Sequence, residues 1–283
     1  MKRFKNALKM ICKNKQALFG MVILIIFLLM ATVGPEIIPE PTTTDYANRL
    51  QGPSFDHPFG TDYAGRDTFG QFVHGSRNVL LVAFVAAIIT ITLGFTVGTI
   101  SGVAGGIVDE ILMGLAGVML TVPSFPIMMV LSMIIQIDNP FLFGVVLSLW
   151  SWAGLARSIR AQILSLKHRD FVEASRVLGM GLFHIIFKEM LPNMVSYILI
   201  NFITVMKSAI TASVGLMVLG LVPFSAQHWG MMINMATTTT GAMYGSTALI
   251  YFLVPVFGIM LFQMGCLFFA NGLDDALNPK LSC

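Results

Sequence analysis

The strongest constraint on this chain is a series of long apolar runs in which charged residues are almost absent. The run at residues 78–103 has no charged residue and exceeds the roughly 20 residues that a helix needs to cross a bilayer. Hydrophobic residues make up 56% of the chain and charged residues 11%, whereas soluble domains carry about 25% charge. A length of 283 residues leaves room for about six spans with short loops. We therefore predict an all-α polytopic membrane protein with six transmembrane helices.

The N-terminal segment is basic and precedes the first uncharged run. Its basic residues are Lys2, Arg3, Lys5, Lys9, Lys13 and Lys15. Under the positive-inside rule this end is cytoplasmic and the first span leads outward. A cleavable signal peptide is the alternative, but the run is long for a signal sequence, and Gly34-Pro35-Glu36 offers no A-x-A-like cleavage site. We favour an uncleaved anchor.

The pattern of charge and hydropathy divides the chain into five segments. These are a cytoplasmic basic N-terminus at 1–16, an anchor helix at 17–35, an extracytoplasmic loop with an interfacial helix at 36–77, a five-helix core at 78–270 and a cytoplasmic tail at 271–283. The core spans are expected near 78–103, 110–135, 141–158, 194–222 and 247–270. Glycines in the first core span (Gly94, Gly98, Gly102) permit close helix approach. Pro123 and Pro126 should bend the second.

The polar segments between spans carry fewer signals. Asp67 suits a helix N-cap, and the apolar residues after it recur at helical spacing: Phe69, Phe72 and Val73. This pattern favours a short helix in the membrane interface. Trp229 and Tyr244 suit an interfacial aromatic belt. A lone His228 indicates a structural loop histidine more readily than a metal ligand.

The stretch at residues 169–193 mixes polar and apolar residues between two long apolar segments. One set recurs at helical spacing: Phe171, Ala174, Ser175 and Leu178. Asp170 suits the N-cap or first turn, and Gly179 suits a left-handed residue that ends the helix. A second helical pattern follows at 183–190, and Pro192 can open the next element. We predict a helix–turn–helix at the membrane surface with one apolar strip free to dock.

Basic residues cluster around this stretch, which places it on the cytoplasmic side with the N-terminus. They are Arg157, Arg160, Lys167, Arg169, Arg176 and Lys188. Lys207 stands near the middle of the expected fifth span, where a cation is costly unless it faces water or a partner. It either lines a translocation path or bonds to backbone carbonyls or to an acid on a partner subunit.

Several residues of the stretch stand at fixed spacing: Glu173, Ala174, Gly179, Ile186, Leu191 and Pro192. Together they resemble the EAA loop of permease subunits in bacterial ABC importers. The segment at 57–67, HPFGTDYAGRD, resembles the one before the second span in C-type permeases of the dipeptide, oligopeptide and nickel importer family. An ordinary amphipathic loop is the alternative, but the likeness covers nearly the whole chain.

The resemblance implies a type I ABC importer permease fold with a cytoplasmic coupling helix in the loop 160–192. The residues implied in ATPase coupling are Phe171, Glu173, Ala174, Ser175, Leu178, Gly179, Leu191 and Pro192. Glu173 would contact the ATPase or cap the coupling turn. Gly179 would allow that turn to be tight. The resemblance also implies a second homologous permease subunit, an extracytoplasmic solute-binding protein, and two subunits that bind ATP and Mg. It places the complex in the cytoplasmic membrane.

The resemblance also bears on the solute. Lys207 and Ser213 fall in the expected translocation path, although the family often has glutamate where Ser213 stands. Arg66 and Asp67 could contact a docked binding protein or form a local ion pair. Peptides are the most common cargo of such permeases, with oligosaccharides and nickel chelates as variations. We therefore expect a di- or oligopeptide importer.

Several functions are disfavoured by what the sequence does not contain. There is no G-x-x-x-x-G-K-[ST] loop, no H-E-x-x-H, no G-x-S-x-G and no C-x-x-C, so we expect neither an enzyme nor a metal or cofactor site. Basic residues flank spans instead of forming a nucleic-acid patch. A stand-alone secondary transporter or channel is the alternative from another class, but no inverted repeat is evident.

Overall fold

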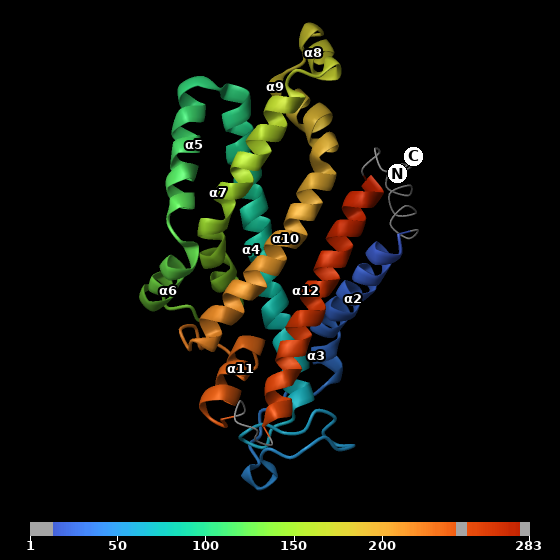
Figure 1. Ribbon diagram of the computed structural model, residues 1–283, viewed down its shortest axis with the longest axis vertical. Helices are drawn as coiled ribbons and strands as arrows, with labels where there is room; N and C mark the ends of the chain where they lie inside the picture. Colours follow the sequence, from blue (N-terminus) through green and yellow to red (C-terminus); the bar gives the residue numbers. More distant parts are fainter. Residues whose placement is uncertain (1–13, 242–247, 278–283) are drawn as a thin grey trace.

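The computed structural model describes residues 14–241 and 248–277, which form a tall bundle of helices (Figure 1). The elements in chain order are α2 (Lys15–Thr32), α3 (Gly34–Ile37), η1 (Tyr46–Asn48), α4 (Thr68–Ala104), α5 (Gly106–Thr121), α6 (Ser124–Ile134), α7 (Pro140–Leu166), α8 (Asp170–Val177), α9 (Leu182–His184), η2 (Ile185–Met190), α10 (Leu191–Val218), α11 (Trp229–Thr238) and α12 (Leu249–Leu277). No strand occurs in these described ranges. The predicted all-α class is confirmed. The basic segment up to residue 13, the tail from residue 278 and Tyr244 lie outside the described residues.

Within the described ranges, five helices are long and apolar enough to cross a membrane: α2, α4, α7, the continuous run from α9 through α10, and α12. The pair α5 and α6 passes the same test together but is bent by 86°. Counting this pair as one span gives six, the predicted number. The bend falls at Pro123, as the sequence predicts, while Pro126 lies in the first turn of α6, where a missing N–H is tolerated.

The long helices alternate in direction, which gives the bundle two distinct ends (Figure 1). The turn between α4 and α5 lies at the end that carries α8, and we call this the α8 end. The described ends of α2 and α12 lie side by side in the half of the bundle nearer to it, because a Cβ on Gly272 would approach the Cβ of Ala17 to 2.5 Å. The loop before α4 and helix α11 lie at the other end, which we call the α11 end.

The tightest seam of the bundle joins α4 and α7. Three glycines on α4 face α7: Gly94, Gly98 and Gly102. A Cβ at these positions would approach Leu155, Ile159 and Ile163 to 2.7–2.8 Å, closer than real Cβ atoms come. The predicted role of these glycines in close helix approach is therefore confirmed.

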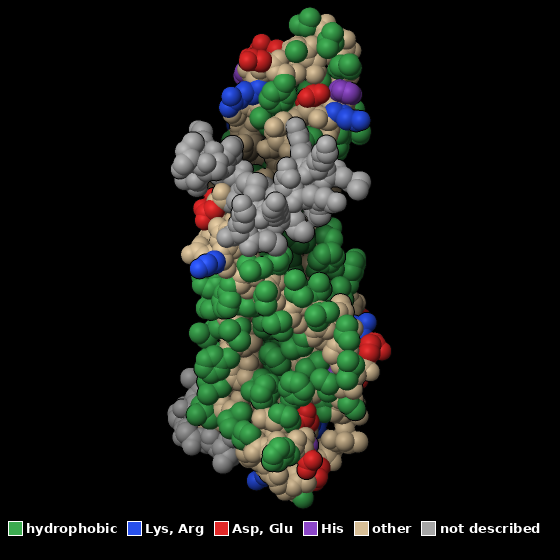
Figure 2. All heavy atoms as spheres, turned by 90° about the vertical axis from the view of Figure 1, so that its right-hand side faces the viewer, with side chains coloured by type: hydrophobic (Ala, Val, Ile, Leu, Met, Phe, Trp, Pro, Cys, Tyr) green, Lys and Arg blue, Asp and Glu red, His purple; other side chains and the backbone are tan. Residues whose placement is uncertain are grey.

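The face formed by α2 and α12 is covered largely by hydrophobic side chains, with charged ones nearer the two ends of the bundle (Figure 2). More than half of the surface is exposed for Phe19, Ile26 and Leu28 on α2 and for Phe257 and Met260 on α12. Since no water reaches the core of a bilayer, a belt of this kind suits contact with lipid chains.

Two expectations about the α11 end are wrong. The residues after Asp67 form no separate interfacial helix; they are the first turns of α4, and the Asp67 carboxylate accepts the N–H of Gly70 as its N-cap (2.6 Å). No proline interrupts residues 68–104, so this helix continues into the span. Trp229 is fully buried: it stacks on Phe72 with ring centroids 5.0 Å apart and donates to the Phe72 carbonyl (3.0 Å).

Candidate coupling surface and solute path

The helix α8 has 8 residues and lies at the tip of the bundle, beyond the other helices (Figure 1). Its side chains include strongly exposed apolar ones, Val177 at 88% and Leu178 at 73% at its end. Phe171 and Ala174 are also exposed. Contiguous exposed apolar groups mark interaction sites. We call Phe171, Ala174, Val177 and Leu178 the α8 surface.

The opposite face of α8 is anchored to the bundle. Val172 is fully buried in an apolar cluster that includes Ile163 of α7 and Ile185 of η2. Ser175 is buried too, because it follows Val172 by three positions and shares its face of the helix. The predicted place of Ser175 on the free strip is therefore wrong, and Val177 occupies that strip instead.

Gly179 ends α8 in the predicted left-handed conformation, with φ of +71°. The N–H of Gly179 bonds to the carbonyl of Arg176 (2.9 Å), and the N–H of Met180 bonds to that of Ser175 (3.0 Å). These two bonds form a Schellman motif. No heavy atom lies within 4 Å of the point where a Cβ would stand, so the backbone conformation and not packing requires glycine here.

The second predicted helix of this region runs into the next span without a break. Pro192 lies in the first turn of α10, as predicted, but η2 precedes it directly as a π-helix. The N–H of Leu191 bonds to the carbonyl of Ile186, the five-residue spacing of a π-helix. Leu191 is half-buried and Pro192 is exposed. The continuous helical run therefore begins at Leu182, just after the turn that ends α8, and extends to Val218.

Glu173 lies in the first turn of α8 with Asp170, where negatively charged side chains interact favourably with the helix dipole. Its side chain is exposed and has no ion-pair partner among the described residues. Backbone bonds close the turn at Gly179. Of the two predicted roles of Glu173, capping is therefore not observed, and contact with a partner stays a prediction.

One face of α10 is polar along the span. Thr204, Ser208 and Thr211 are exposed and follow one another at helical spacing. The amide of Gln263 on α12 donates to the Thr211 hydroxyl (3.1 Å). Lys207 lies beside them, half-buried, and makes no ion pair within residues 14–241 and 248–277. We call Thr204, Lys207, Ser208 and Thr211 the α10 polar face.

Ser213 does not belong to this face. It is fully buried, and its hydroxyl donates to the Ile210 carbonyl of its own helix (3.0 Å). The structure therefore separates the two predicted path residues: Lys207 stays accessible from outside the chain, and Ser213 faces the bundle interior.

In the loop before α4, Arg66 pairs with Asp62 and not with Asp67, so the predicted local pairing has the wrong partner. Nη2 of Arg66 lies 2.7 Å from the Asp62 carboxylate, which is fully buried and also accepts from Gln71 (2.9 Å). Burial alone would lower the pKa of Arg66, but the hydrogen bond and charge of Asp62 raise it above its usual value. Asp67 contacts His57 (3.1 Å).

His228, at the start of α11, is fully buried, and its Nδ1 accepts the N–H of Gly230 (3.2 Å). Burial lowers the pKa of His228 to about 3, so the ring is neutral at pH 7. It has a structural role at this helix start. Across the described part of the chain, no group of three His, Cys, Asp or Glu side chains could hold a metal ion.

Arg160 of α7 and Asp109 of α5 form a cross-helix pair that no sequence pattern predicted. Nε and Nη2 of Arg160 each lie 2.5 Å from the carboxylate of Asp109, which also accepts from Ser101. The two partners are 51 positions apart, and no local pattern joins them. The pair links the start of α5 to α7 near the α8 end.

Comparison with known proteins agrees with this architecture. Residues 94–282 match the family described as binding-protein-dependent transport system inner membrane component, and residues 2–53 match the N-terminal TM domain of oligopeptide transport permease C. The chain is 34% identical to the oligopeptide transport system permease protein OppC of Bacillus subtilis, over 98% of this chain and 90% of that protein. It is also 34% identical to the dipeptide transport system permease protein DppC of the same species, over 98% of this chain and 86% of that protein. A putative peptide permease protein of Brucella suis is 35% identical over 95% of this chain and 88% of its own length. The chain therefore belongs to the family of inner membrane permease components of binding-protein-dependent ABC transport systems.

Proposed function

We propose that this chain is the permease subunit of an ATP-driven, binding-protein-dependent importer of di- and oligopeptides. Family membership supports the transport role, and relatives named as oligopeptide and dipeptide permeases support a peptide solute. In this scheme the chain hydrolyses no ATP. Two separate subunits bind ATP and Mg, a second related permease completes the pathway, and an extracytoplasmic protein delivers the solute.

The geometry of α8 is the observation that carries the proposal. The α8 surface is free on one side, while Val172 anchors the other side to α7 and η2. A groove on an ATP-hydrolysing subunit would bury the α8 surface and contact Glu173. Because η2 continues into α10, closure of the ATPase subunits would move α10 with α8 and give alternating access. The α8 end then faces the cytoplasm together with both ends of the chain.

The α10 polar face would line the solute path against the second permease. A polar solute needs such a surface inside a bilayer, and Lys207 would favour carboxylate groups. The α11 end would receive the binding protein. There Arg66 and Asp67 would shape the docking loop, since both are engaged within the chain.

The test uses the complete complex in proteoliposomes, with peptide-loaded binding protein added outside. Glu173→Lys and Gly179→Pro should leave membrane insertion intact and abolish the stimulation of ATP hydrolysis and peptide uptake. Glu110→Lys, at an exposed acid of α5, is the matched control and should stay stimulated. Unchanged stimulation in both α8 variants would contradict the coupling role. Peptide uptake without any ATPase subunit would point to a stand-alone transporter.

A further inference from the structure

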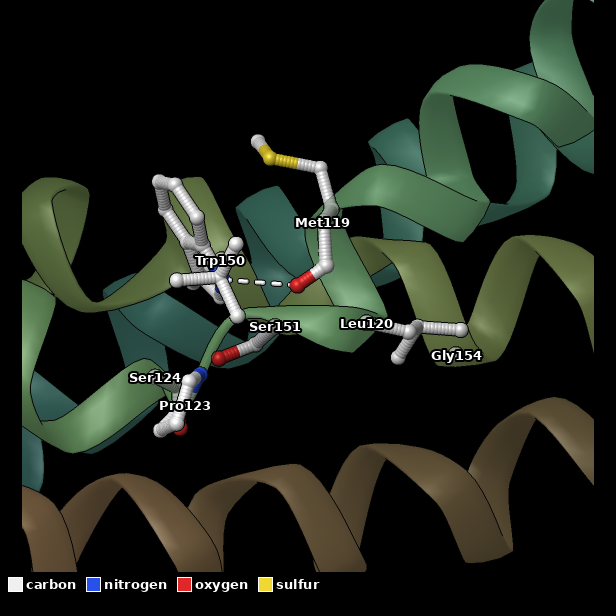
Figure 3. A pocket seen from close by; sticks show the side chains of 8 residues that line it. Met119, Leu120, Pro123, Ser124, Trp150, Ser151 and Gly154 are labelled. Carbon is white, nitrogen blue, oxygen red and sulfur yellow. Dashed lines mark hydrogen bonds between the residues drawn. The ribbon is translucent and has the colours of Figure 1, made fainter.

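A cleft opens where α5 and α6 meet at their 86° bend, and we call it the elbow cleft (Figure 3). Its volume is about 310 Å³. It is lined by Met119, Leu120, Val122, Pro123, Ser124, Trp150, Ser151 and Gly154. At 1.5 Å per residue, Trp150 lies about 15 Å along α7 from its start, roughly half the thickness of a bilayer core.

The bend leaves backbone groups of α5 without helical partners. Pro123 has no N–H, so the carbonyl of Met119 loses the donor that would follow four residues later. The indole N–H of Trp150 replaces that donor at 2.8 Å (Figure 3). Trp150 therefore holds the end of α5 against α7 and forms one wall of the elbow cleft.

Further polar groups around the elbow cleft stay available. α5 ends at Thr121, and no hydrogen bond from any described residue reaches the carbonyl of Leu120, a residue that lines the elbow cleft. The Ser151 hydroxyl donates to the Leu147 carbonyl (2.9 Å) and keeps its acceptor lone pairs. The exposed Ser124 adds a second hydroxyl. Lipid chains cannot satisfy such groups, and each one left unpaired in hydrocarbon is costly.

We infer that the elbow cleft binds the backbone of the transported peptide during its passage, a conclusion that rests on the proposed function. The Leu120 carbonyl and the Ser151 hydroxyl accept from peptide N–H groups, and the Ser124 hydroxyl donates to a peptide carbonyl. No charged side chain lines the elbow cleft, so it recognises the peptide unit without selecting side-chain charge. Its volume is at the lower end of ligand pockets, which suits one short stretch of peptide.

The elbow cleft also adjoins the proposed path. A Cβ on Gly215 of α10 would lie 3.2 Å from the ring of Phe125, so the start of α6 packs directly on α10. Gly215 follows Thr211 by four positions and therefore continues the line of the α10 polar face. A solute that leaves the elbow cleft meets that face next.

The test measures uptake of a tripeptide by the complete complex in proteoliposomes. Gly154→Leu fills the elbow cleft, because only a side-chain atom of Leu120, 3.8 Å away, lies near a Cβ there. Uptake should fall more than tenfold. Gly114→Leu is the matched control, since nothing lies within 4 Å of its Cβ, and it should transport normally.

A second comparison uses the same tripeptide with a methylated backbone nitrogen, which removes an N–H donor. The wild-type chain should show a higher KM for the methylated peptide, and Ser151→Ala should reduce this preference about three- to tenfold, the value of one hydrogen bond. Ser158→Ala, which removes a similar hydroxyl of α7 outside the elbow cleft, should keep the preference.

The outcomes separate the two proposals. Absence of tripeptide uptake by the wild-type complex would reject the peptide function and this inference with it. Normal wild-type uptake, with unchanged uptake in Gly154→Leu and unchanged preference in Ser151→Ala, would reject the peptide site alone. Cross-linking of Gly154→Cys to the second permease in every state would also overturn it, because the elbow cleft would then be filled by that subunit.

Discussion

The two ends of the bundle differ in which side chains they bury and which they leave exposed. At the α11 end, several polar side chains are buried and bonded within the chain: Asp62 holds Arg66 and Gln71, and Trp229 bonds to Phe72. At the α8 end, apolar groups are left uncovered, with Val177 and Leu178 mostly exposed. The first arrangement stabilises a fixed shape, whereas the second is complete only when a partner covers it.

The largest expected effect is at Asp62. Asp62→Asn would leave the Arg66 charge without its buried partner, and we expect a loss of about 3–5 kcal/mol in the free energy of unfolding. Denaturant unfolding of the purified chain in detergent measures it. Asp56→Asn, at an exposed carboxylate of the same loop, should change little. Equal stability of the Asp62 and Asp56 variants would show that the α11 end does not depend on its buried ion pair.

The next effect concerns the anchor of α8. Val172→Ala removes two buried methyl groups and should destabilise the docking of α8 by about 2 kcal/mol. Hydrogen exchange of α8 amides should then accelerate about 30-fold, while amides of α11 keep their rates. Unchanged exchange in α8 would mean that Val172 is not what holds this helix to the bundle.

Acid should weaken the α11 end through His228. Burial lowers the pKa of His228 to about 3 in the folded chain, against about 6.5 when unfolded, so the unfolded state binds the extra proton. Stability is therefore complete above pH 6.5 and falls by up to about 1.4 kcal/mol per pH unit below it, until the pH reaches the folded pKa. Unfolding midpoints between pH 7 and pH 4.5 measure this slope. His228→Asn, which keeps an N-cap acceptor, should reduce it, and an equal slope would exclude His228 as its source.

The smallest effect on stability is expected on the α8 surface. Leu178→Gln replaces a side chain that is 73% exposed, so the free energy of unfolding should change by no more than about 0.5 kcal/mol. ATP hydrolysis stimulated by loaded binding protein should nevertheless fall in the assembled complex. A stability loss above about 1 kcal/mol would instead mean that Leu178 packs within the chain.

Local features of the fold could be predicted from sequence because they depend on neighbours along the chain. The left-handed Gly179, the break at Pro123 and the glycine seam of α4 all follow from backbone chemistry or helical spacing. The N-cap at Asp67 was predicted for the same reason, although the helix that it begins proved far longer than expected.

Features that depend on distant residues could not be predicted. The burial of Trp229 requires Phe72, far away in the sequence. Val172 packs against α7 and η2, and this contact determines which face of α8 is turned toward the bundle. The spacing within α8 alone therefore could not predict that Ser175 is buried.

Cross-linking from the tip of α8 would show whether the ATP-hydrolysing subunits bind at the α8 end. Cys12, Cys266 and Cys283 would first be replaced by serine, and Leu178→Cys would then be introduced. In the assembled complex we expect Leu178→Cys to cross-link to an ATP-hydrolysing subunit and, in intact cells, to resist impermeant thiol reagents. Labelling of this cysteine from outside the cell, or no cross-link to an ATP-hydrolysing subunit in any nucleotide state, would contradict the proposed coupling.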